Sequence, residues 1–462
     1  MRDPRTRGCM ALAAFSIAIK FALVLFTIAV GTAESQTFST LFNFDNTNGA
    51  NPYDALVQGR DGSLYGTTYV GGATGQGVVF KISPNGAFTL LHSFHDTDGR
   101  NPTAWLLLGN NGNFYSTAYV GGANEVGTVY KVTRKGNVTT LYTFAGPDGS
   151  DPQAGLALGS DNNFYGTTRM GGANGYGTIF KMTPKGILTT LHNFSLTDGE
   201  YPIAGLTLGF DGDLYGTTWA GGNNNGTVFK ITPAGAFTTL ISFNGTKGSA
   251  PVGGLLQADD GNFYGTTSGG GANGLGTVFR MTPSGTLTAL HSFSSGEGKG
   301  PVATLALGND ANFYGATPEG GANGFGTLFE ITPAGTFTTL HNFSVADGES
   351  PIAIVQNTNG VFYGAAMFGG SQTVGTVFSF DQGLHPFVSL QPIFSKVGKT
   401  VRIIGEGFTG ATGVSFNGVS GKFKIVSDTY LTAVVPSGAA TGFVTVTTPA
   451  GTLTSNRMFH VQ

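Results

Sequence analysis

The chain has 462 residues, with 76 glycines, 12% aromatic and only 11% charged side chains. So few charges and so many aromatic residues exclude a charged disordered polymer and favour short strands joined by tight turns. The formal net charge is −3, and the first 33 residues carry four basic and one acidic side chain, so the remainder carries −6. No basic stripe remains, and we therefore expect no nucleic-acid partner.

The N-terminal segment has the order of a secretory signal peptide. Arg2, Arg5 and Arg7 precede an apolar run over residues 10–30, and small residues follow up to Ala33. This order predicts a signal peptide over residues 1–33, a mature chain without a membrane span, and a secreted or cell-surface protein. An uncleaved membrane anchor is the alternative, because the run has about the 20 residues that a span needs. The single cysteine lies in this segment, so the mature chain has no thiol for a disulfide or a zinc site.

One tyrosine recurs along the chain with a period of 49 or 50 residues and defines seven tandem repeats. Its copies are Tyr65, Tyr115, Tyr165, Tyr215, Tyr264, Tyr314 and Tyr363. So regular a period is typical of an architecture in which each unit packs on the next.

Each repeat is predicted to contain four short antiparallel strands, which in the third repeat cover residues 154–159, 163–168, 177–183 and 187–194. Val, Ile, Phe and Thr alternate with polar residues there, and Gly, Asp, Asn and Pro separate the segments. The pattern predicts an all-β fold with a seven-bladed β-propeller over residues 37–390, in which the fourth strand of each blade is outermost. An open solenoid is the second interpretation.

Two segments could supply the last strand of the seventh repeat. Residues 38–44 form a strand of the fourth type with no partners before it, and residues 386–390 repeat the same pattern after the last repeat. The sequence does not choose between them.

The tail, residues 391–462, has a different pattern and is predicted to be a separate β-sandwich domain. Over residues 393–461 it resembles the IPT/TIG domains. The matching positions are Gly398, Val401, Ile403, Gly405, Gly407, Phe408, Phe416, Asn417, Gly418, Ser427, Asp428, Pro436, Thr441 and Gly442. The resemblance implies an immunoglobulin-like fold.

The repeats themselves, over residues 38–384, resemble the bacterial GloVer-type tandem repeat of exported choice-of-anchor proteins. The resemblance is carried by the recurring blocks FYGTT, GGANG and GTVFKITP. It implies export and extracellular or surface display, with no established reaction.

Several conspicuous motifs have structural explanations. The GGANG blocks are followed by a strand, whereas a phosphate-binding loop leads into a helix, so we interpret them as turns. The acidic turns at residues 96–102 and 147–152 offer too few ligands for calcium. Histidines recur at one position of the fourth strand in four repeats, and basic residues recur on the third strand. We expect the histidines to be partly exposed strand residues and the basic residues to be solvated or to make contacts between blades. We assign no catalytic residue, metal site or cofactor.

The most informative position is the one at which the repeats disagree, just before each Gly-Gly pair. We assign ligand binding to Tyr69, Tyr119, Arg169 and Trp219 at this position of four consecutive repeats, and to Tyr176 in the same loop. Aromatic platforms beside a guanidinium suit a sugar chain or an extended peptide. The alternative interpretation is an exposed turn that varies freely.

The sequence leaves three functions open. The first is an extracellular binding or scaffolding protein, a monomer whose rim engages a polysaccharide or a surface protein. The second is a secreted lyase or glycosidase acting in a central pocket, and the third is a purely structural protein of the envelope or matrix.

Overall fold

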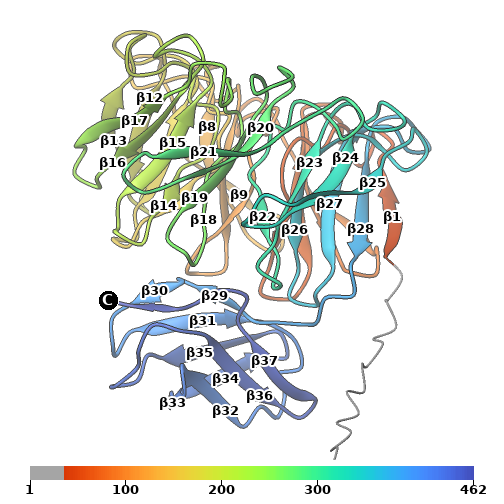
Figure 1. Ribbon diagram of the computed structural model, residues 1–462, viewed down its shortest axis with the longest axis vertical. Helices are drawn as coiled ribbons and strands as arrows, with labels where there is room; N and C mark the ends of the chain where they lie inside the picture. Colours follow the sequence, from red (N-terminus) through yellow and green to blue (C-terminus); the bar gives the residue numbers. More distant parts are fainter. Residues whose placement is uncertain (1–35) are drawn as a thin grey trace, which may run out of the picture. The chain divides into compact units, whose positions relative to one another are not determined.

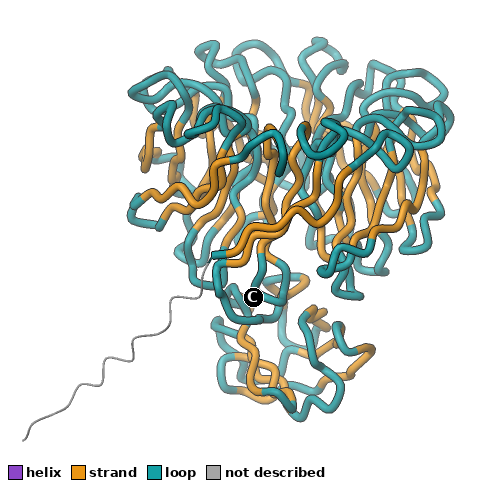
Figure 2. Tube along the Cα trace, turned by 90° about the vertical axis from the view of Figure 1, so that its right-hand side faces the viewer, coloured by secondary structure: helices purple, strands orange, loops and turns teal. Residues whose placement is uncertain are grey.

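The computed structural model describes residues 36–462, which are built of strands and loops and contain no helix (Figure 2). The predicted signal peptide lies outside this range. Within it, no helix is long and apolar enough to cross a membrane.

The repeats form seven four-stranded antiparallel sheets, an arrangement consistent with a propeller (Figure 1). The first three sheets are β2 (Val57–Gln58), β3 (Leu64–Thr68), β4 (Val78–Ile82), β5 (Phe88–Ser93); β6 (Leu107–Leu108), β7 (Phe114–Ala118), β8 (Thr128–Val132), β9 (Val138–Thr143); and β10 (Ala157–Leu158), β11 (Phe164–Thr168), β12 (Thr178–Met182), β13 (Leu188–Asn193). The next three are β14 (Thr207–Leu208), β15 (Leu214–Thr218), β16 (Thr227–Ile231), β17 (Phe237–Ser242); β18 (Leu256–Gln257), β19 (Phe263–Thr267), β20 (Thr277–Met281), β21 (Leu287–Ser292); and β22 (Ala306–Leu307), β23 (Phe313–Thr317), β24 (Thr327–Ile331), β25 (Phe337–Asn342).

The seventh sheet joins the two ends of the repeat array. It contains β26 (Glu349–Gln356), β27 (Phe362–Phe368), β28 (Thr376–Asp381) and, outermost, β1 (Thr37–Asn43), which pairs antiparallel with β28. The seventh and first repeats also contact each other, because Gln58 donates to Thr358 Oγ1 (2.6 Å) and Asn357 donates to Gly62 O (3.1 Å). Of the two candidate segments, residues 38–44 therefore supply the last strand.

The repeating tyrosine explains why one sheet packs on the next. Tyr65 is fully buried, its ring lies 4.3 Å from that of Phe114 in the next repeat, and its hydroxyl donates to Asp61 (2.9 Å). Such an aromatic contact contributes about 1 kcal/mol beyond burial of its area. A side chain at the following Gly66 would meet Leu56 and Phe80, which would have to shift, and the other repeats have glycine at this place except the second, which has Ser116. The Tyr-Gly step is thus a packing motif.

The repeating polar residues also serve the fold. Lys81 pairs with Asp61 (2.7 Å) and Lys181 with Asp161 (2.8 Å), each within its own sheet, so the expectation of contacts between blades is wrong for these lysines. The four histidines each pair with an acidic residue six positions later. These pairs are His92–Asp98, His192–Asp198, His291–Glu297 and His341–Asp347.

The tail forms two four-stranded sheets around a common apolar core (Figure 1). One contains β29 (Ser389–Gln391), β31 (Thr400–Ile404), β35 (Tyr430–Val434) and β34 (Phe423–Ser427); the other contains β33 (Val419–Ser420), β32 (Gly413–Phe416), β36 (Val444–Thr448) and β37 (Gly451–Thr454). The short strands β30 (Phe394–Ser395) and β38 (His460–Val461) pair in parallel. Because β29 pairs with β31, residues 389–391 belong to the tail and not to the seventh repeat sheet.

Candidate functional site

The variable loops join the second and third strands of each repeat, and their glycine pairs fix the backbone. In the third repeat Gly171 and Gly172 have φ values of 75° and 77°, in the left-handed region that favours glycine. A side chain at Gly171 would also strike the backbone of Gly149, and β12 follows the loop. The pair therefore builds a turn, as predicted, and presents the residue before it at a fixed position.

Three of the predicted binding residues belong to one series of contacts. Arg169 Nη1 donates to the hydroxyl of Tyr119 (3.2 Å), and its guanidinium lies 5.6 Å from the ring centroid of Tyr201. The Tyr201 ring in turn lies 6.1 Å from that of Trp219, which is 43% exposed. Tyr119, Arg169, Tyr201 and Trp219 thus form a continuous surface across three repeats, which we call the aromatic rim.

The other two predicted residues lie beside different partners. The Tyr69 ring is 5.9 Å from that of Tyr53, an exposed tyrosine of the first repeat. Tyr176 is half-buried and packs against the apolar core between the third and fourth repeats, and its carbonyl accepts the backbone N–H of Tyr201 (3.1 Å). Tyr176 therefore contacts Tyr201 through the backbone, while its own side chain packs on the core.

Tyr201 was missed by the sequence argument, although the repeats contain a signal for it. It has a φ of 55°, a conformation that costs a bulky side chain about 1–2 kcal/mol. The equivalent residues of the other repeats share a positive φ; Asn51, Asn101, Asp151 and Gly300 suit it better than tyrosine, and Ala250 and Ser350 are smaller. Asparagine adopts this backbone conformation at a lower free-energy cost than tyrosine. The presence of tyrosine therefore indicates that the contacts of its ring matter at this place.

A pocket of about 330 Å³ is lined by residues at or just before the first strand of every repeat, which we call the first strand segments. Its walls are mainly small and aliphatic; the residues include Tyr53, Asp54, Thr103, Trp105, Gln153, Ile203, Ala204, Val252, Gly253, Val302, Ala303 and Ile352. Pro318 and Met367, at the variable loop position of the sixth and seventh repeats, also line it. The variable position therefore contributes to the mouth of this pocket, which we call the axial pocket.

Asp54 is the one carboxylate that the first strand segments place in the axial pocket. Six repeats have a small residue at this place: Ala104, Ala154, Ala204, Gly253, Ala303 and Ala353. The Asp54 carboxylate accepts the backbone N–H groups of Ala55 (2.6 Å) and Trp105 (3.0 Å). Burial raises its pKa to about 7 against these two hydrogen bonds, which lower the pKa. Near neutral pH this carboxyl can therefore accept or donate a proton.

Trp105 is a second break in the repeat and occupies space that glycine leaves free. Its ring lies against the backbone of Gly155 and Gly205, where any side chain would overlap it. Trp105 thus gives the axial pocket an aromatic wall next to Asp54. Both residues are visible in the sequence as departures from the other repeats at these places, whereas the predicted binding residues came from the loop before Gly-Gly.

Comparison with solved structures shows a likeness of fold. The chain matches a fungal alcohol oxidase of the AA5 family, in complex with copper, at 14% identity and a TM-score of 0.52, covering 92% of this chain and 98% of the oxidase. It also matches a gluconolactonase from Xanthomonas campestris at 11% identity and a TM-score of 0.37, covering 56% of this chain and 82% of the lactonase. No curated protein matches the sequence.

The family comparison covers most of the chain. The model of the Gloeobacter/Verrucomicrobia repeat matches residues 24–226 and again residues 211–421. The two matches together span all seven copies of the repeating tyrosine. The chain therefore belongs to the Gloeobacter/Verrucomicrobia repeat family.

Proposed function

We propose that this protein is exported and binds an extracellular polysaccharide, with the aromatic rim holding the chain and the axial pocket receiving its end. The observation that carries this proposal is the contact series from Tyr119 through Arg169 and Tyr201 to Trp219. Its members come from three repeats, and Tyr201 is held there at a conformational cost. Such an arrangement is expected where a surface is built for a partner.

The chemistry of the two regions suits a sugar chain. Aromatic faces pack on the C–H face of a sugar ring, and the Arg169 guanidinium offers donors to hydroxyl or carboxylate oxygens. In the axial pocket, Trp105 supplies another aromatic face and Asp54 an acceptor for a hydroxyl. Aliphatic walls around a few polar groups are typical of small-ligand pockets.

The architecture in this proposal is a closed seven-bladed propeller followed by an immunoglobulin-like domain. Pairing of β1 with β28 and the contacts of Gln58 with Thr358 support closure. The two sheets around one core support the sandwich assignment of the tail, which would act as a spacer or adhesive module. Export and display at the cell surface rest on the signal-like N-terminal segment.

A glycan array tests the proposal with variants taken from the protein's own repeats. Tyr201→Asn and Trp219→Ser install residues found at the equivalent places of other repeats, so the fold should tolerate them. Each should weaken polysaccharide binding by at least about tenfold, because an aromatic contact residue contributes more than about 1.4 kcal/mol. Phe443→Ala, at an exposed phenylalanine of the tail, should bind like the wild type.

Two outcomes would contradict the binding proposal. One is the absence of any polysaccharide ligand for the folded wild type, which would favour a structural role in the envelope or matrix. The other is a ligand that both rim variants bind as tightly as the wild type.

Catalysis in the axial pocket is the second candidate function, and one observation favours it. Asp54 carries a pKa near neutrality beside Trp105, as a residue that transfers protons to a substrate requires. An enzyme would release new chain ends from the bound polysaccharide, and Asp54→Ala would abolish that release while leaving binding at the rim. If wild type and Asp54→Ala release chain ends equally, or neither does, catalysis at Asp54 is wrong.

A further inference from the structure

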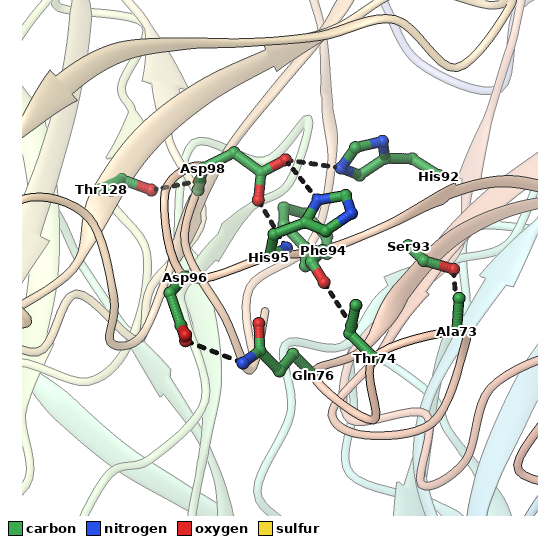
Figure 3. A network of polar contacts seen from close by, with 10 residues as sticks. All are labelled: Ala73, Thr74, Gln76, His92, Ser93, Phe94, His95, Asp96, Asp98 and Thr128. Carbon is green, nitrogen blue, oxygen red and sulfur yellow. Dashed lines mark hydrogen bonds and ion pairs between the residues drawn. The ribbon is translucent and has the colours of Figure 1, made fainter.

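Two histidines and an aspartate converge at the end of β5 in the first repeat (Figure 3). His92 Nε2 lies 2.8 Å and His95 Nδ1 lies 3.6 Å from the same oxygen, Asp98 Oδ2. One ligand atom from each of the three residues falls within 4.8 Å of the others. The cluster lies outside both the aromatic rim and the axial pocket.

The carboxylate of Asp98 is held in place by its own turn. Its second oxygen accepts the backbone N–H of His95 (2.8 Å), and the backbone N–H groups of Asp98 and Gly99 both donate to His95 O (3.1 Å). The hydroxyl of Thr128 donates to the carbonyl of Asp98 (3.0 Å; Figure 3). These backbone hydrogen bonds orient the carboxylate so that Oδ2 faces the two imidazoles, in the way that hydrogen bonds to a metal ligand fix its orientation.

Comparison with the other repeats shows which residues of this cluster recur and which occur only in the first repeat. The His–acid pair recurs in three of them and ties the same turn. Where the first repeat has His95, those repeats have Ser195, Ser294 and Ser344. The second imidazole is thus an addition to a turn that forms without it.

The surroundings of His92 also differ from those of its counterparts. In the other three repeats the imidazole stacks on a phenylalanine of the next sheet at 3.9–4.0 Å; these phenylalanines are Phe237, Phe337 and Phe38. The corresponding residue beside His92 is Val138. His92 therefore turns towards Asp98 without an aromatic ring covering its face, while His95 is 58% exposed on the solvent side.

We propose that His92, His95 and Asp98 bind one divalent transition-metal ion, with Zn²⁺ as the natural probe. Two imidazole nitrogens and one carboxylate oxygen are a common donor set for this ion, and three protein ligands leave a position for water or a ligand. Metal binding at His92 Nε2 requires the neutral imidazole with its hydrogen on Nδ1, so the hydrogen bond from Nε2 to Asp98 is replaced by two bonds to the ion. Arg100, two residues after Asp98, pairs with Asp96 (3.0 Å) and Glu125 (2.9 Å), so two carboxylates offset its positive charge.

Titration calorimetry with ZnCl₂ on untagged protein tests the site with one variant that should lose Zn²⁺ binding and one that should gain a second Zn²⁺ site. The wild type should bind one ion that His95→Ser does not. Loss of a direct ligand should weaken affinity more than about 100-fold, beyond the 10–100-fold that outer partners cost. Ser195→His should build the same cluster in the third repeat, around His192 and Asp198, and raise the stoichiometry by one.

Cu²⁺ electron paramagnetic resonance gives a second readout that folding defects do not imitate. The wild-type spectrum should show coupling to two imidazole nitrogens, and the His95→Ser spectrum to one, while both proteins melt at similar temperatures without metal. If His95→Ser binds Zn²⁺ like the wild type, or if the wild type binds none, the proposed site does not exist.

Discussion

At the scale of single residues, Asp54 brings a carboxyl group into a pocket whose walls are mostly aliphatic. Burial opposes its charge, and its pKa of about 7 lies well above the value of about 3.9 for an unfolded chain. Between these two values the folded protein holds a proton that the unfolded chain has lost. Asp54 therefore favours folding at low pH and ceases to do so as the pH rises through about 7.

Replacing Asp54 should accordingly change how stability depends on pH. Between about pH 4 and 7 the wild type should lose melting temperature relative to Asp54→Ala, because over this range the unfolded wild type has lost a proton that the folded protein still holds in the pocket. Alanine stands at this place in most other repeats, so the variant should fold. Melting curves that stay parallel over this range would show that Asp54 titrates as an ordinary surface carboxyl.

The second residue-scale prediction concerns the contact between Trp105 and Gly205. Gly205→Ala should destabilise the protein by about 1–3 kcal/mol, because the added methyl group overlaps the indole ring. The same change in a Trp105→Ala background should cost much less. Gly296→Ala, at a glycine with open space around it, is the control and should be nearly neutral. Equal costs in both backgrounds, measured by urea denaturation, would contradict the packing described here.

Which residues could be predicted from the sequence depended on what was compared among the repeats. The loop position before Gly-Gly pointed to Tyr119, Arg169 and Trp219, and the structure brings these three into one contact series. Tyr201, which connects Arg169 to Trp219, was missed because it lies outside the loop before Gly-Gly, and the positive φ that makes tyrosine unusual at this place of the repeat is seen only in the structure. His95 was missed because the histidines were compared between repeats and not within one.

At the scale of elements, strand type was predictable and strand extent was not. The second, third and fourth strands of the third repeat lie within one or two residues of the prediction, since turns bound them closely. The first strand is only Ala157–Leu158, shorter than the six residues expected. Residues 154–156 do not continue the ladder, because Gly155 lies against the Trp105 ring and Leu156 packs into the apolar core, which side-chain alternation alone cannot reveal.

The outermost strand of the seventh sheet gives an element-scale prediction. Ser39 on β1 and Ser379 on β28 are directly paired, so Ser39→Cys with Ser379→Cys should form an intramolecular disulfide in a Cys9→Ser background. Because the bond closes a very long loop, the oxidised protein should be more stable than the reduced one by roughly 3–5 kcal/mol. Single-cysteine variants are the control, and failure to cross-link would place β1 elsewhere in solution.

At the scale of the whole molecule, the tail contacts the turns between the first and second strands of several repeats. Arg457, whose side chain is 16% exposed, donates to Gln257 O and lies 3.7 Å from the carboxylate of Asp259. Burial lowers its pKa, and Asp259 opposes that effect. On the repeats of the first half, Thr429 Oγ1 donates to Arg60 O (2.7 Å), and the Arg60 guanidinium lies 4.5 Å from the Tyr430 ring.

Arg457→Ala should weaken the attachment of the tail to the repeats. The change removes the cation beside Asp259, whose side chain is 21% exposed, and should cost about 1–2 kcal/mol. We expect a lower melting temperature and faster proteolysis near residues 382–388, whereas Arg457→Lys should lie between the variant and the wild type. Unchanged melting and proteolysis would show that this ion pair does not hold the tail.

The number of repeats, their four-strand composition and the family could all be predicted from the sequence, because they follow from local patterns that recur seven times. The axial pocket could not, since it combines one short segment from every repeat. Its character depends on Asp54 and Trp105, two departures from a consensus that is otherwise small and apolar.

We propose that the aromatic rim and the axial pocket together bind one polysaccharide chain. A crystal structure of the protein with an oligosaccharide selected on the glycan array tests it most directly. We predict sugar rings packed on Tyr201 and Trp219, with the chain end in the axial pocket against Trp105. Sugar bound only to the tail, or at a site away from both regions, would contradict binding at the aromatic rim and the axial pocket.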